Sequence, residues 1–229
     1  MRATAFRWIL RGEPFDPGAH ADEKGFPAIL RHLVSQRGIP EGEAMDSFLH
    51  PKLRDLSDPF LMPDMQAAVA RILQAVDAKE TVCIYGDYDV DGVSAITLMS
   101  KILHAYGLEP RPFIPRRGAE GYGLSLAAIE RCLSEGTKPD LLISVDCGTV
   151  SVNEVAHLRA MGIDVIIADH HEPNPEGRPD CAALVNPKCG DDFTYLCATG
   201  VVFKIGHALL KTRPAPLDLK ELLDLVAVA

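Results

Sequence analysis

Short apolar runs alternate with helical patterns from residue 81 onward. Five runs are largely apolar on both faces, which is typical of strands covered on both sides of a sheet. They are Val82–Tyr85, Arg111–Ile114, Leu141–Val145, Val165–Ala168 and Ala183–Val185. Helical patterns separate the first four, at Val93–Tyr106, Ser125–Ser134 and Ser151–Met161. Repeated strand, helix, strand order predicts an α/β fold, with an open, mostly parallel sheet and helices on both faces.

The residues before this pattern are predicted to be helical. Apolar residues at helical spacing predict a helix that packs on the sheet: Met65, Val69, Ile72 and Val76. Earlier in the chain, Pro27–Arg37 and Glu41–Leu49 read as short helices, and residues 51–63, with three prolines, read as an extended connector. We therefore predict a helical N-terminal extension at residues 1–63 and a main domain at residues 64–229.

Two further helices, Thr199–Leu210 and Asp218–Ala229, complete the pattern. The last one finishes in the apolar run L-V-A-V-A, whereas domain boundaries usually fall in polar linkers. We therefore expect the chain to be a fragment of a longer protein.

Composition indicates a globular protein, with 47% hydrophobic and 24% charged residues. No apolar run approaches the roughly 18–20 residues of a membrane span, and no signal peptide is recognisable, so we expect a soluble, cytoplasmic protein without membrane partners. The six cysteines include no C-x-x-C pair, which favours reduced core thiols over zinc ligands or disulfides. A net charge of −9 gives no overall electrostatic case for nucleic acid, but clustered carboxylates that bind divalent cations would add to the formal negative charge without repelling a phosphate once loaded.

Polar residues follow three of the predicted strands. Asp87, Asp89 and Asp91 follow the first, Asp146 follows Leu141–Val145, and D-H-H at 169–171 follows Val165–Ala168. Because the carboxyl ends of parallel strands meet at one edge of a sheet, we expect all three clusters on one rim. Carboxylates with one or two imidazoles suit Mn²⁺ or Mg²⁺, and the lack of thiolates argues against a structural zinc site.

Other interpretations of these residues exist. D-x-D-x-D-G resembles an EF-hand calcium loop, but the glutamate required at position twelve is Leu98, and a strand precedes the motif. A solvated acidic turn would crowd three like charges unless a cation neutralised them. Asp146 alone fits a helix N-cap ahead of Ser151 equally well, and an isolated His-His pair is usually on the surface.

Three segments resemble the first three motifs of the DHH phosphoesterase superfamily: Y-G-D-Y-D-V-D-G-V-S-A, I-S-V-D-C-G-T and A-D-H-H-E-P. The similarity is strongest to its exonucleases specific for single-stranded DNA. It extends to F-L-H-P-K-L-R-D-L-S-D-P-F, I-P-R-R-G-A-E-G-Y-G-L, L-V-N-P-K and A-T-G-V-V-F-K, covering most of residues 27–229. The resemblance implies a two-metal hydrolase that degrades single-stranded DNA from the 5′ end in repair and recombination.

The resemblance also implies roles for individual residues. The implied metal ligands are Asp87, Asp89, Asp91, Asp146 and His170. Asp146 would bridge the two ions, and Asp87 would be a ligand or a support for one. The implied catalytic residues are His171, which would approach the scissile phosphate, and Asp169, which would orient a neighbouring imidazole. The implied substrate contacts are Arg116, Tyr122 and Asn186.

The chain departs from the family pattern in two respects. The fourth motif, an aspartate shortly after a segment like L-V-A-V-A, is not in the sequence, so we expect this fragment alone to be impaired and to bind Mn²⁺ weakly. Tyr85 stands where some members carry histidine, which disfavours a pyrophosphatase-like site. A phosphodiesterase acting on short oligonucleotides or cyclic dinucleotides remains an alternative, as does a scaffold relative, although intact motifs favour an enzyme.

Overall fold

The computed structural model describes residues 9, 14–16, 26–118, 120–175 and 177–229. The chain divides into two compact units, Met1–Ser57 and Asp58–Ala229. The predicted division between residues 63 and 64 stays a prediction. Among the described residues, no helix combines the length and the apolar composition needed to cross a membrane.

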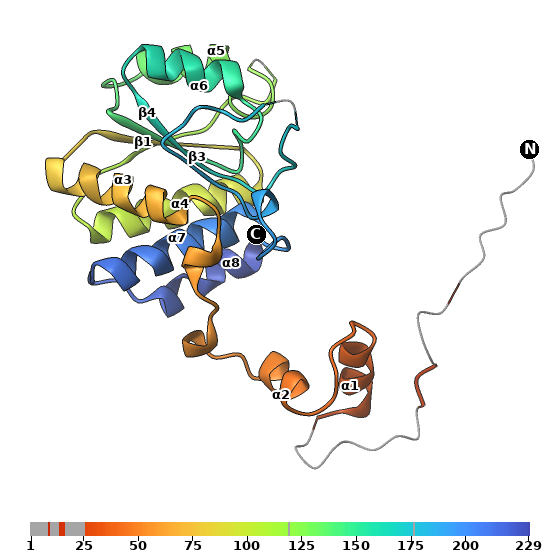
Figure 1. The fold of residues 1–229 in the computed structure, drawn as a ribbon. Coiled ribbons are helices and arrows are strands. Elements are labelled where there is room, and N and C mark those ends of the chain that lie inside the picture. Colours follow the sequence, from red (N-terminus) through yellow and green to blue (C-terminus); the bar gives the residue numbers. More distant parts are fainter. Residues whose placement is uncertain (1–8, 10–13, 17–25, 119, 176) are drawn as a thin grey trace, which may run out of the picture. The chain divides into compact units, whose positions relative to one another are not determined.

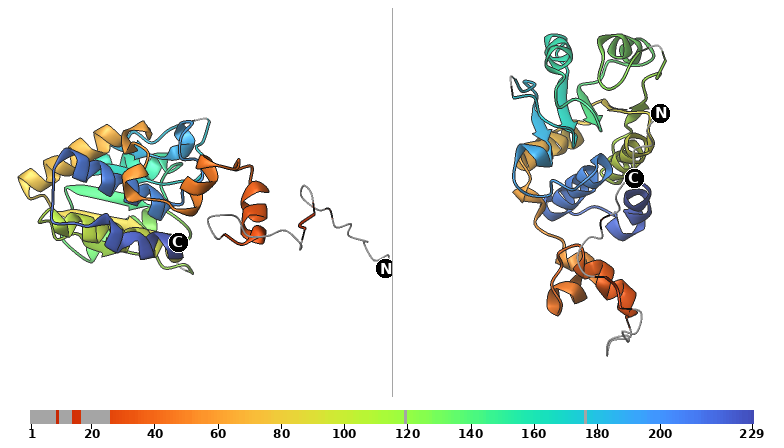
Figure 2. Two further views of the ribbon diagram at one scale, coloured as in Figure 1. Left: turned by 90° about the horizontal axis from the view of Figure 1, so that it is seen from below. Right: turned by 90° about the vertical axis from the view of Figure 1, so that its right-hand side faces the viewer.

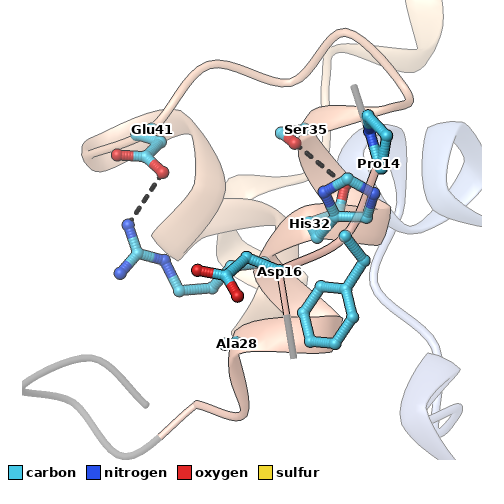
Figure 3. Close-up of a pocket in the computed structure, with 8 residues that line it drawn as sticks. Pro14, Asp16, Ala28, His32, Ser35 and Glu41 are labelled. Carbon is cyan, nitrogen blue, oxygen red and sulfur yellow. Dashed lines mark hydrogen bonds and ion pairs between the residues drawn. The ribbon is translucent and has the colours of Figure 1, made fainter. Parts of the chain in front are cut away.

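In its described residues, the first unit contains two short helices, α1 (Ala28–Ser35) and α2 (Glu43–Leu49). An ion pair of 2.9 Å joins Arg31 to Glu41, and the Ser35 hydroxyl donates to the backbone oxygen of His32 (Figure 3). These side chains, with Pro14, Phe15 and Asp16, line a cavity of about 340 Å³. The segment predicted as an extended connector instead forms two 3₁₀ turns, η1 (Leu53–Asp55) in this unit and η2 (Pro59–Leu61) in the second.

The second unit is built on a five-stranded parallel sheet (Figure 1). Its strands are β1 (Val82–Gly86), β2 (Arg111–Phe113), β3 (Leu141–Val145), β4 (Asp164–Ala168) and β5 (Ala183–Val185). The order β2-β1-β3-β4-β5 places consecutive crossovers on opposite sides of β1. The carboxyl ends of β1 and β3 are therefore the topological switch point, where α/β sheets usually bind ligands.

Helices cover both faces of the sheet, as predicted (Figures 1 and 2). One face carries α3 (Met65–Ala78), α4 (Val90–Ala105) and α7 (Ala198–Thr212), with η4 (Leu219–Leu222) and α8 (Leu223–Val228) beyond them. The other carries α5 (Leu126–Ser134) and α6 (Val152–Ala160). Every residue of β1 and β3 is buried, which accounts for their uninterrupted apolar sequence. All six cysteines lie in the described residues as free thiols; Cys83, Cys132 and Cys147 are core residues as expected, whereas Cys181 and Cys197 are partly exposed and Cys189 is exposed.

Glu120 fastens the segment between β2 and α5. Its carboxylate accepts hydrogen bonds from the Arg131 guanidinium, at 2.5 and 2.9 Å, and from the backbone N–H of Arg116 at 2.7 Å. These hydrogen bonds, that from Arg131 foremost, lower the pKa of Glu120 to about 2. The Glu120 carboxylate is 9% exposed, so water screens its ion pair with Arg131 only weakly.

Glu120→Gln is expected to lower the unfolding temperature at pH 7, because a neutral amide accepts weaker hydrogen bonds than a carboxylate. The folded-state pKa lies below the ordinary value, so the stabilisation is present above about pH 4.5 and is lost as the pH falls toward 2. Thermal unfolding at several pH values measures this. The control is Glu135→Gln, which removes the more exposed partner of Arg131 and should have a smaller effect. Equal shifts for both variants, or a difference that grows in acid, would contradict the assignment.

Candidate metal centre

The loop after β1 presents two carboxylates with different surroundings. Asp87 is fully buried, and within the described structure neither of its carboxylate oxygens has a hydrogen-bond partner. Burial raises its pKa, and the charge of Asp89 acts in the same direction. Asp89 is the N-cap of α4 and accepts from the N–H of Gly92 at 3.0 Å. A Cβ at Gly92 would stand 2.4 Å from the backbone oxygen of Asp87, so only glycine allows this close turn.

The N-terminus of α4 lies three residues earlier than expected. The pattern predicts a start at Val93, whereas the helix begins at Val90, so Asp91 lies in its first turn. Three alternating aspartates are compatible with a loop up to Gly92, but Asp89 also favours an N-cap and Asp91 is favourable in a first turn.

Asp146 lies at the centre of the cluster. It follows β3 with a φ of 60°, a left-handed conformation that few residues other than glycine adopt. The residue is 2% exposed, and the neighbour of its Oδ1 is the imidazole of His170, whose Nε2 lies 3.3 Å away. Burial raises its pKa to about 6, while the nearby His170 opposes the shift. A buried carboxylate in this state is unfavourable without a positive partner.

Two groups of possible ligand atoms share Asp146. One contains Asp87, Asp89 and Asp146, and the other Asp146, His170 and His171; within each, the ligand atoms all lie within 4.8 Å of one another. The Nε2 atom of His170 is 3.3 Å from Oδ1 of Asp146 and 3.6 Å from Oδ2 of Asp91. The interaction with Asp146 raises the pKa of His170. The three polar clusters predicted to share one rim therefore do so.

The carboxylate of Asp169 contacts the imidazole ring of His171, whereas it contacts only the backbone N–H of His170. Its Oδ1 lies 2.7 Å from Nδ1 of His171 and also accepts from the N–H groups of both histidines, while Oδ2 accepts from the N–H of Thr149. Burial alone would raise the pKa of Asp169, but the hydrogen bonds from His171 and Thr149 outweigh it and lower the pKa to about 2. The same contact raises the pKa of His171.

An aromatic loop extends the site beyond the histidines. The Tyr122 hydroxyl lies 3.0 Å from Nε2 of His171, and Tyr122 is 57% exposed. Buried Tyr85 anchors this loop by donating its hydroxyl proton to the backbone oxygen of Gly123 at 2.8 Å. Tyr88 meets the Tyr122 ring edge to face, and the Arg117 guanidinium lies 5.2 Å from the Tyr88 ring centre. A cavity of about 570 Å³ opens beside Tyr122 and His171.

Of the three predicted substrate contacts, Arg116 and Asn186 do not contact the histidines with an exposed side chain as Tyr122 does. The guanidinium of Arg116 is 69% exposed and approaches Glu135 at 4.0 Å. Asn186 is fully buried, and its amide donates to Oγ1 of Thr149 and to the backbone oxygen of His171. A side chain without exposed surface cannot meet a substrate, so we assign Asn186 to holding the His171 loop instead.

Three supporting residues lie within the quoted motifs, but the sequence does not indicate their contacts. Thr199 hydrogen bonds to Asp91 from more than a hundred residues away, and Tyr85 and Thr149 act through the loops that they anchor. Arg117 and Tyr88 also lie inside quoted motifs, and only that position could have indicated them.

The residues fit a divalent cation. The unpartnered oxygens of buried Asp87 lie near Asp89 and Asp146, and such a group of carboxylates is stabilised when a cation binds it. Oxygen donors supplemented by imidazole, with no thiolate, match the preferences of Mn²⁺ and Mg²⁺ better than those of structural Zn²⁺.

Fold and site together define an α/β protein with a carboxylate and histidine metal centre at the switch point of a parallel sheet. The family model described as "DHH family, N-terminal domain" matches residues 81–229, and the chain belongs to this family.

Named relatives agree with this placement. "Single-stranded-DNA-specific exonuclease RecJ" of Bacillus subtilis is 38% identical over 232 residues, which cover 100% of this chain and 28% of that protein. A crystal structure of exonuclease RecJ bound to manganese superposes with a TM-score of 0.65 and 31% identity, over 72% of this chain and 42% of that one. The crystal structure of RecJ from Thermus thermophilus in complex with Mn²⁺ superposes with a TM-score of 0.62 and 29% identity. The match covers 77% of this chain and 24% of that one. The chain thus spans less than a third of the Bacillus protein.

Proposed function

We propose that this chain carries the metal centre of a two-metal phosphodiester hydrolase that degrades single-stranded DNA from its 5′ end. The observation that supports this most strongly is the position of Asp146, a buried carboxylate common to two groups of ligand atoms. A carboxylate in that position can bridge two cations, and paired cations are a common solution for displacement at phosphorus.

We assign the ligands as two sets. Asp87, Asp89 and Asp146 would hold one cation, and Asp91, Asp146 and His170 the other. The cations, Mn²⁺ or Mg²⁺, would supply positive charge that offsets the negative charge developing on the phosphoryl group. Both RecJ structures described above are complexes with manganese, and the donor set here suits that ion.

We assign His171 the role of contacting the scissile phosphate. Its Nδ1 is bound to the Asp169 carboxylate, so Nε2 is the atom left to meet substrate, in exchange for the hydroxyl of Tyr122. The Asp169 carboxylate raises the pKa of His171 and therefore favours an imidazolium that donates a hydrogen bond to a phosphate oxygen. Asp169 positions the ring, as carboxylates do for imidazoles in metal sites.

The preference for single strands is supported by the name of the Bacillus relative and by the exposed Tyr122, on which an unpaired base could stack. Arg116 remains a proposed phosphate contact. Attack from the 5′ end, a role in repair and recombination, and a cytoplasmic location are part of the same proposal and follow the family resemblance. We propose further that residues 64–229 form the phosphoesterase domain and residues 1–63 an extension to it.

The direct test measures Mn²⁺-dependent release of nucleotides by the protein that carries this chain. Substrates are a 5′-labelled single strand, the same strand as a duplex, and di- to pentanucleotides. We expect mononucleotides from the long single strand and little from the duplex. Faster hydrolysis of the short oligonucleotides would instead support a phosphodiesterase of the same family, and no hydrolysis of any substrate would support a scaffold.

A further inference from the structure

The N-terminus of α7 binds the carboxylate of Asp91. The N–H of Ala198 donates to Oδ2 at 2.7 Å, and the N–H of Thr199 donates to Oδ1 at 2.8 Å. The Thr199 hydroxyl lies 2.7 Å from the same Oδ1 and 3.0 Å from the backbone oxygen of Asp91. These two residues are separated from Asp91 by more than a hundred positions, so the contact joins the beginning of α4 to the beginning of α7.

This contact replaces a local helix cap. Cys197, the N-cap residue of α7, makes no capping hydrogen bond with its side chain, so the first N–H groups of this 15-residue helix depend on an acceptor from elsewhere. Asp91 supplies both oxygens, and its negative charge complements the positive end of the helix dipole. Thr199 is fully buried and the Asp91 side chain is 13% exposed, so little water competes for these bonds.

The same carboxylate faces the metal centre. Oδ2 of Asp91, which accepts one hydrogen bond from α7, lies 3.6 Å from Nε2 of His170. A carboxylate oxygen has two lone pairs, so Oδ2 keeps one for a cation while Oδ1 takes two donors from Thr199. One oxygen of the carboxylate is thus fixed by Thr199, and the other remains available to a cation.

We propose that Thr199 is a positioning residue that fixes Asp91 for metal binding at the subsite shared with Asp146 and His170. This inference rests on the proposed two-metal function. The inference gives a physical role to the A-T-G segment at the start of α7, for which the sequence alone shows only a resemblance to the family. Removing hydrogen bonds that orient a ligand commonly weakens metal affinity by about 10- to 100-fold. The group formed by Asp87, Asp89 and Asp146 does not include Asp91 and should be unaffected.

The test compares Mn²⁺ binding, followed by electron paramagnetic resonance up to millimolar concentrations, in three variants of the chain. Thr199→Val removes the hydroxyl at nearly constant volume, and Thr199→Ser retains it. Thr212→Val is the matched control, because Thr212 also lies on α7 but donates its hydroxyl proton to the backbone oxygen of Ala208, within the same helix. Each is also made in an Asp89→Asn background, in which the subsite containing Asp91 dominates binding.

We expect Thr199→Val to weaken Mn²⁺ binding about 10- to 100-fold in the Asp89→Asn background, with Thr199→Ser and Thr212→Val close to their parent. Unchanged affinity in Thr199→Val, beside a wild type that binds Mn²⁺, overturns this inference and leaves the proposed function intact. Equal losses in Thr199→Val and Thr212→Val also overturn it, because they indicate general loosening of α7. A wild type that binds no Mn²⁺ overturns both. If Thr199→Val does not fold without metal, Thr199→Ala takes its place with the same expectations.

Discussion

Asp146→Asn is expected to reduce Mn²⁺-dependent hydrolysis of single-stranded DNA by at least about a thousandfold, equivalent to about 4 kcal/mol of activation free energy. The substitution leaves the shape of the side chain unchanged but removes the negative charge that both ligand groups share. If Asp146 is shared as proposed, its loss would disturb both cations together, whereas loss of Asp89 would affect a single group. The measurement is the rate of nucleotide release at saturating Mn²⁺.

The same variant should not lose stability when metal is absent. In Asp146, burial outweighs the contact with His170, because the net result is a pKa raised to about 6. A neutral amide weakens that contact but relieves the larger cost of the buried charge. We expect an unfolding temperature equal to or above that of the wild type in chelator. The exposed Asp191 provides the control Asp191→Asn, which should change neither property. Near-normal hydrolysis by Asp146→Asn would refute its bridging role.

Asp169→Asn is expected to slow hydrolysis by about 10²- to 10⁴-fold, by analogy with other sites in which a carboxylate fixes the tautomer of a catalytic imidazole. One carboxylate oxygen accepts from Thr149 and the other from His170 and His171, and the amide nitrogen of asparagine cannot accept at whichever of the two positions it takes. Because these groups are buried, we also expect a loss of about 1–3 kcal/mol in the free energy of unfolding. Rates are therefore compared well below the unfolding temperature of the variant.

A double-mutant cycle separates the two consequences. If Asp169 acts on the rate through His171, then adding Asp169→Asn to a His171→Ala protein should slow hydrolysis little further. Stability, in contrast, should fall in both backgrounds, because in each the amide nitrogen leaves the N–H of either Thr149 or His170 without an acceptor. Additive effects on the rate would show that Asp169 has a role independent of this imidazole.

Much of the fold and the rim could be predicted from the sequence, since both follow from local patterns. Continuous apolar runs separated by helices define a parallel sheet, and the carboxyl ends of its strands must share an edge. Asp87, Asp146 and Asp169 each come one residue after a strand, so the topology alone brings them together. The predicted start of α4 is wrong, because a D-x-D-x-D sequence is compatible with both a loop and a capped helix.

The direction of individual side chains was not predictable in the same way. Asn186 and Arg116 both resemble substrate contacts in sequence, yet one is buried in the support of His171 and the other is exposed beside Glu135. The pairing of Asp91 with Thr199 depends on where α7 packs, and packing is set by the whole core rather than by either segment. Assignment of the individual ligands stays a prediction for the same reason.

The central claim is that Asp146 is shared by two divalent cations. Diffraction from crystals soaked in Mn²⁺, recorded at the manganese absorption edge, locates bound ions without reference to activity. We predict two anomalous peaks on either side of Asp146, one beside Asp87 and Asp89 and the other beside Asp91 and His170. Bound manganese with no peak within coordination distance of Asp146 would contradict the account.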